Sequence, residues 1–121
     1  MNAAKPVQQL HQEHMDWLKR LDFYIDEIAI MKPLIEDVAA KNTSPEILAQ
    51  VEHFQNQIII QKNHVDELRH DINDHESFLE KRADKEPFAH DHPVLRDRMM
   101  TFETLFHQLR KELYVFLAKV L

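Results

Sequence analysis

The 121-residue chain contains no glycine and no cysteine. Without glycine, backbone positions with positive φ are unfavourable, and tight β-hairpins are therefore disfavoured. Without cysteine, disulfides, thiolate metal ligands and cysteine nucleophiles are excluded. A glycine-rich phosphate-binding loop is also excluded, because such a loop requires glycine. These absences favour an all-α protein and remove several classes of enzyme.

Long hydrophobic runs are also missing. No apolar stretch approaches the roughly 18 residues that span a membrane. The N-terminal sequence Met-Asn-Ala-Ala-Lys-Pro has no apolar core after its charge, so we expect no secretory signal. We therefore expect a soluble, cytoplasmic protein with no membrane contact, built as a single domain over residues 1–121.

Positive charge is outnumbered by negative charge. The chain has 15 lysines and arginines against 21 acidic residues, a formal net charge of −6. General nucleic-acid binding depends on a basic face, so we expect no nucleic-acid partner. No serine or threonine accompanies a histidine and an acid in a recognisable nucleophile motif. We therefore expect no catalytic residues, and no enzyme activity other than one that depends on an unrecognised metal centre.

What the chain does contain is an unbroken hydrophobic repeat from Pro45 to about Arg82. Its positions alternate by four and three residues, the period of about 3.5 that is typical of helices packed along a seam. Two of these positions are polar, Gln61 and His75. The repeat consists of Ile47, Val51, Phe54, Ile58, Gln61, Val65, Leu68, Ile72, His75 and Leu79.

Two similar repeats predict two further helices. The first has His14 at a seam position and Pro33 in its interior, where we expect a kink in a continuous helix. The last has an uninterrupted apolar seam. The expected helices cover residues of about 6–41, 45–83 and 93–121. Short connections make them an antiparallel up-down-up bundle of three long helices with heptad-like seams, the second helix being the longest.

Reflecting residue positions about the two turns, near residues 43 and 88, gives an approximate register. In this geometry the third helix reaches only to about residue 55, and the tip of the first hairpin is left uncovered. An exposed apolar patch of this size is typical of an interface. We therefore expect a homodimer formed through the tip, with interface residues Ile30, Leu34, Ile47, Leu48 and Val51.

Most of the nine histidines gather at the opposite end of the bundle. Reflection places His11 and His14 opposite residues 72–75 of the second helix and residues 101–104 of the third. Imidazole and carboxylate groups on facing helices suit iron or zinc. The candidate metal ligands are His14 and His75, which occupy seam positions, together with His11, His107, Glu103 and His70.

Three functions remain open. The leading interpretation is a non-catalytic bundle that acts through a protein partner or through self-association. In that case His14 and His75 are buried polar residues that fix register, as a buried asparagine does in coiled coils. The alternative is a metal-binding bundle with iron or zinc at the end opposite the tip. A lesser alternative is a pH-responsive bundle whose histidines protonate together near pH ~6.

The first helix also carries a family resemblance. The stretch Leu10-His11-Gln12-Glu13-His14 is similar to the opening helix of hemerythrin-like domains, in which an acidic residue precedes a metal-binding histidine and leucines follow at helical spacing. The resemblance is confined to residues 10–18. It implies that His14 is an iron ligand in an oxygen-binding or iron-sensing bundle.

Overall fold

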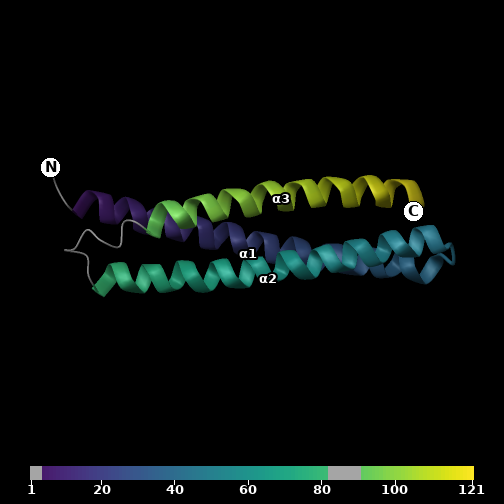
Figure 1. Ribbon diagram of the computed structural model, residues 1–121, viewed down its shortest axis with the longest axis horizontal. Coiled ribbons are helices and arrows are strands. Elements are labelled where there is room, and N and C mark those ends of the chain that lie inside the picture. Colours follow the sequence, from purple (N-terminus) through teal and green to yellow (C-terminus); the bar gives the residue numbers. More distant parts are fainter. Residues whose placement is uncertain (1–3, 82–90) are drawn as a thin grey trace.

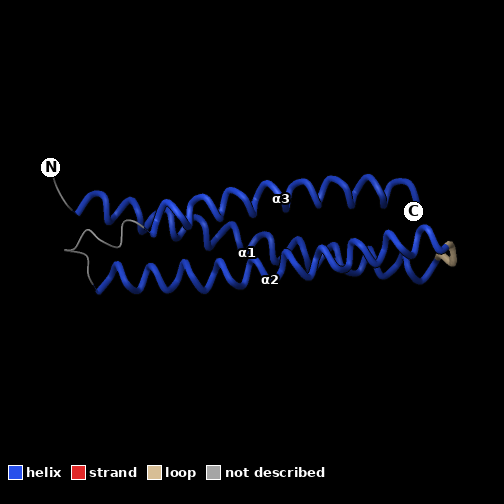
Figure 2. The backbone as a smooth tube through the Cα atoms, in the orientation of Figure 1, coloured by secondary structure: helices blue, strands red, loops and turns tan. Residues whose placement is uncertain are grey.

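Long helices make up almost all of the part of the chain that the structure describes. The computed structural model describes residues 4–81 and 91–121, with the side chains of residues 8–78 and 92–121. The helices are α1 (Ala4–Lys41), α2 (Pro45–Lys81) and α3 (Asp91–Val120). They lie side by side in alternating directions (Figure 1). Figure 2 shows the 42–44 turn at one end, with the starts of α1 and α3 towards the other. The described residues contain no strand, which confirms the all-α antiparallel bundle.

Side-chain caps close the turn between α1 and α2. The Ser44 hydroxyl accepts a hydrogen bond from the backbone N–H of Ile47 at 3.5 Å, and Asn42 Nδ2 donates to the Val38 carbonyl at 2.8 Å. These contacts satisfy backbone groups that have no partner within the helices. Pro45 occupies the first turn of α2, where its missing N–H costs nothing. The predicted boundaries at Lys41 and Pro45 are confirmed.

The helix lengths differ slightly from expectation. α1 is continuous through Pro33, as predicted, and spans 38 residues. α2 spans 37, so within the described residues the second helix is not the longest. α1 gains its length because it begins at Ala4 rather than Pro6, and proline is tolerated within a first turn. The expected end of the second helix near residue 83 lies outside the described residues. None of the described helices combines the length and apolar character that crossing a membrane requires.

Buried apolar residues from all three helices form one continuous core. It extends from Trp17 near the open end of the bundle to Val38 and Val51 near the turn. The most deeply buried large side chains include Phe106 and Leu21. Among the side chains that the structure describes, five polar ones are buried along with this core: His14, Gln61, His75, Glu76 and His92. Because buried polar groups require partners, these five residues mark where the bundle is specialised.

α1 and α3 run parallel with a constant offset of 83 residues. This offset recurs in the pairs Glu13–Arg96, Arg20–Glu103 and Glu27–Arg110, which we call the charge ladder. Reflection of residue positions about the two turns predicted that residues 101–104 lie beside His14. That prediction was wrong, because its offset is one to two helical turns larger than the observed one. Reflection about a turn takes no account of charge, whereas a shift of one turn would separate every pair of the ladder.

The observed register brings α3 further along the hairpin than expected. Val120 and Ile47 line one surface groove, so α3 reaches the turn end instead of stopping opposite residue 55. Of the predicted interface, Val51 is buried inside the chain, and Leu34 and Ile47 are partly buried against the core. Ile30 and Leu48 remain exposed. The prediction that the apolar tip is uncovered was therefore wrong, while the homodimer itself stays a prediction.

Candidate metal centre

Three histidines, one from each helix, meet at the end of the bundle away from the 42–44 turn. They are His14 of α1, His75 of α2 and His92 of α3, which we call the histidine trio. One ring nitrogen of each lies within 4.8 Å of the other two, an arrangement with room for a metal ion. All three are buried, with exposed fractions of 0%, 7% and 1%. Imidazoles seldom gather in a core without a partner that uses their nitrogens.

The helix seams bring the trio together. His14 and His75 replace apolar residues at seam positions of α1 and α2, so both rings point into the bundle. The ring centroids of His14 lie 5.1 Å from His75 and 4.9 Å from His92. Trp17, one turn after His14, stacks on His92 at 4.9 Å. The indole therefore closes the trio off from the rest of the core.

A buried carboxylate holds His14 from the α2 side. His14 Nδ1 donates to Glu76 Oε1 at 2.8 Å, and His11 Nδ1 contacts the other carboxylate oxygen. Burial raises the pKa of Glu76, but the hydrogen bonds from His14 and His11 outweigh it and leave this pKa below its usual value. Glu76 is therefore ionised and fixes the His14 ring with Nε2 turned towards the trio.

A second carboxylate holds His92 from the α1 side. His92 Nε2 donates to Glu13 Oε1 at 2.9 Å. Arg96 donates to the same carboxylate at 2.7 and 3.1 Å, and this pairing lowers the pKa of Glu13 to about 2. Glu13 is therefore also ionised. It fixes the His92 ring with Nδ1 turned towards the trio.

The two inner nitrogens face each other across the trio. His14 Nε2 and His92 Nδ1 are 3.1 Å apart. A neutral imidazole carries only one N–H, and in each ring that N–H already serves a carboxylate. Burial lowers the pKa of His14 and of His92, although their carboxylate partners act in the opposite direction. At neutral pH the inner nitrogens therefore present lone pairs to each other, and a cation between them would stabilise the arrangement.

The structure brings together some of the predicted site residues and separates others. It places His14 and His75 in one group and links His11 to them through Glu76. His70 lies on an exposed face of α2 and is not part of the trio. Whether the grouped residues bind a metal stays a prediction.

Glu103 and His107 were expected near His14 and belong instead to a separate network around Tyr24. The Tyr24 hydroxyl donates to Glu103 and lies 3.4 Å from His107 Nε2. Arg20 donates to Glu103 at 2.8 Å. Tyr24 is ten residues beyond His14, about 15 Å along the helix. The register of the charge ladder places both residues there, which corrects the predicted ligand set.

Sequence reasoning missed His92, Glu76 and Glu13. The expected third helix started at residue 93 and left His92 outside it, whereas α3 begins at Asp91 and includes His92. The nearest signal is Pro93, which favours a first-turn position and so places His92 at the helix start. Glu76 and Glu13 each adjoin a seam histidine, but adjacency on a helix does not show which residue a side chain will contact.

No family model, curated protein or solved structure matches the chain. The resemblance of residues 10–18 to hemerythrin-like domains therefore stays a prediction. The geometry of the histidine trio is the basis on which function can be inferred.

Proposed function

We propose that the chain is a metal-binding helical bundle in which His14, His75 and His92 hold one divalent transition-metal ion, zinc or iron. One observation carries the proposal. The inner nitrogens of His14 and His92 face each other at 3.1 Å, while the outer nitrogen of each ring donates to a carboxylate. Histidine ligands in metal sites characteristically donate their second N–H to a carboxylate or carbonyl, which fixes the ring.

The separation of the inner nitrogens suits two ligands of the same ion. Zinc–nitrogen bonds of about 2.0–2.1 Å in a tetrahedron put two ligand atoms about 3.3–3.4 Å apart. The observed 3.1 Å differs from this by a few tenths of an ångström. The nearest His75 nitrogen lies within 4.8 Å of both, so a modest shift of one ring completes three ligands. Three imidazoles suit zinc and iron, and they leave a coordination position for water or another small ligand.

Of the functions that the sequence left open, we therefore favour metal binding over interaction with a partner alone. In this proposal the bundle remains a binding protein rather than an enzyme. A buried histidine that only fixed register would need one hydrogen-bond partner. Here two histidines on different helices are each oriented by a separate acid, Glu76 and Glu13, so that they converge.

Elemental analysis and a fluorescence titration of tag-free protein test the proposal. Trp17 is the only tryptophan in the chain and lies against the site, so Co²⁺ should quench its emission with one equivalent bound. His14→Ala, His75→Ala and His92→Ala should each abolish stoichiometric binding. The exposed His53→Ala should bind as the wild-type protein does.

Circular dichroism of each metal-free variant checks that the helices persist. A wild-type protein that binds neither Zn²⁺, Fe²⁺ nor Co²⁺ at micromolar concentration would refute the proposal. So would folded trio variants that still bind one equivalent.

A further inference from the structure

Each pair of helices meets the histidine trio along a different interface, and two of the three interfaces are bridged there by hydrogen-bonded side chains. On the α1–α2 interface, His11 and Glu76 contact each other beside His14. On the α1–α3 interface, Arg96 and Glu13 form a two-point hydrogen-bonded pair beside His92. The α2–α3 interface is different, because a groove opens along it.

His75 lies on the wall of this groove. The groove has a volume of about 320 Å³, and we call it the His75 groove; its lining residues are Asp71, Asp74, His75, Phe78, Val94, Leu95 and Arg98. His75 belongs both to the trio and to the groove wall, and it is the most exposed of the three histidines at 7%. His75 therefore connects the trio to the groove between α2 and α3.

Charge is distributed unevenly along the His75 groove. Arg98 of α3 donates to Asp71 of α2 at 2.8 Å, and both side chains are partly exposed. Among the described residues, the exposed Asp74 forms no ion pair. Asp74 is one residue from His75, so its negative charge is available at the mouth of the groove. A carboxylate there attracts a hydrated divalent cation.

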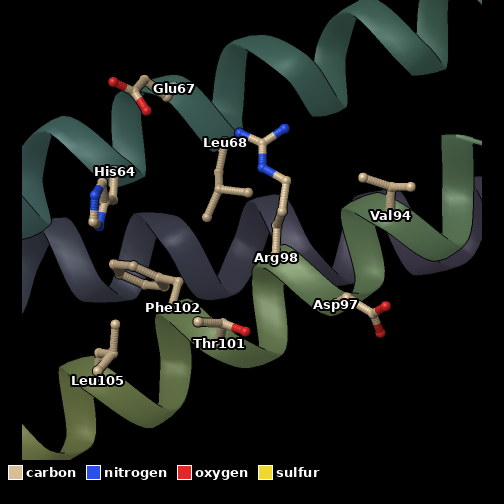
Figure 3. Close-up of a pocket in the computed structure, with 9 residues that line it drawn as sticks. All are labelled: His64, Glu67, Leu68, Val94, Asp97, Arg98, Thr101, Phe102 and Leu105. Atoms are coloured by element: carbon tan, nitrogen blue, oxygen red, sulfur yellow. The ribbon is translucent and has the colours of Figure 1, made fainter.

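Arg98 separates the His75 groove from a second hollow along the same interface. Figure 3 shows this second hollow, in which Arg98 extends from α3 towards α2 beside Leu68. Arg98 and Val94 line both hollows. The positive guanidinium neutralises Asp71, so of the two acidic side chains that line the groove only Asp74 presents an uncompensated negative charge to a cation.

We propose that the His75 groove is the route by which a divalent metal ion reaches and leaves the histidine trio. Asp74 attracts the hydrated ion, and Arg98 limits this attraction because it neutralises Asp71, the other acidic side chain of the groove. The inference rests on the proposed metal-binding function and adds how that site is loaded.

Stopped-flow mixing with Co²⁺, followed by Trp17 quenching, measures the rate of uptake. Mixing the loaded protein with excess chelator measures the rate of release. Asp74→Asn should slow both uptake and release by roughly threefold to tenfold, with the dissociation constant changing by less than either rate. Arg98→Gln should accelerate both. Asp26→Asn, at an exposed position of α1, makes the same change in net charge and should leave both rates unchanged.

The possible results separate the two proposals. A wild-type protein that shows no quenching and no bound metal overturns both. Stoichiometric binding with Asp74→Asn and Arg98→Gln indistinguishable from Asp26→Asn overturns the access route alone. Release that becomes faster in Asp74→Asn while uptake stays constant identifies Asp74 as a ligand of the bound ion, which also overturns the route. Melting curves of the metal-free variants verify that each is folded.

Discussion

The indole of Trp17 stacks on the imidazole of His92, with ring centroids 4.9 Å apart and ring planes inclined by 25°. The same indole lies 5.6 Å from the ring of His14. A residue of α1 therefore covers a residue of α3 at the centre of the candidate metal site. Any change in ligation or protonation of these histidines should alter the emission of the one tryptophan in the chain.

Glu76→Gln should weaken metal binding by about 10- to 100-fold, the usual cost of losing a group that orients a histidine ligand. The amide keeps the shape of the side chain but removes the charge that holds His14 Nδ1–H. Competition with a chelator of known affinity measures the change. The matched control is Glu52→Gln on an exposed position of α2, which should bind as the wild-type protein does. Equal affinities of the two variants would show that Glu76 does not orient a ligand.

Metal-free protein should lose stability as the pH falls below about 6.5. Burial lowers the pKa of His14 and of His92 in the folded state, so the unfolded chain binds protons first. The stability linked to these groups is complete above pH ~6.5 and is lost as the pH falls towards their folded pKa values, by up to about 1.4 kcal/mol per pH unit for each group.

Urea unfolding at pH 7.5, 6.5 and 5.5 measures this slope. Replacing both His14 and His92 by glutamine should flatten it, whereas His53→Gln should not. The lowered pKa values of Glu13 and Glu76 act in a separate window, below about pH 4.5. A stability that is constant between pH 7.5 and 5.5 would contradict the prediction.

Gln61→Leu should stabilise the protein by about 1–2 kcal/mol. Gln61 is buried in the α2 seam, and its Oε1 has no hydrogen-bond partner among the described residues. An unsatisfied buried amide carries a desolvation cost that an apolar side chain of similar size avoids. Urea unfolding gives the free energy, with the exposed Gln50→Leu as the control. A loss of stability would mean that Gln61 has a partner and fixes the register.

Tyr24→Phe should destabilise the bundle by about 1–3 kcal/mol, because Glu103 loses the hydroxyl that donates to it. Burial, together with the Glu103 hydrogen bond, raises the pKa of Tyr24. Its contribution to stability is therefore complete below pH ~10 and is lost as the pH rises above that value. Phenolate absorbance in a Tyr114→Phe background follows Tyr24 alone, since the chain has two tyrosines. Half-titration near pH 10 would contradict the prediction.

Self-association through the turn end now depends on the exposed Ile30 and Leu48. If the predicted homodimer forms there, Ile30→Glu should lower the average mass in sedimentation equilibrium at micromolar concentration. Met100→Glu, on an exposed position of α3 nearer the histidine trio, should not lower it. If the wild-type protein has the mass of one chain at these concentrations, the prediction of a homodimer is wrong.

Local chemistry made much of the fold predictable from the sequence. The break between the first two helices depends on Ser44 and Pro45, whose capping and first-turn preferences act within a few residues. His14 and His75 were correctly placed side by side because each replaces an apolar residue in a seam, and seam residues must face the bundle interior.

The register of α3 could not be predicted from the apolar pattern. A seam with a heptad period looks the same after a shift of seven residues, so hydrophobic spacing does not select between such registers. The charge ladder does select, but it consists of pairs between residues 83 positions apart. One error of register accounts both for the misplaced Glu103 and His107 and for the apolar tip that was expected to be uncovered.

The trio takes one member from each helix, so no two helices can build the site without the third. The α1–α2 hairpin supplies His14 and His75, and only a docked α3 adds His92. Tight binding of an ion would thus require all three helices to be packed together. Occupancy would report that the whole bundle has closed, and withdrawal of metal would weaken the docking of α3 on the hairpin.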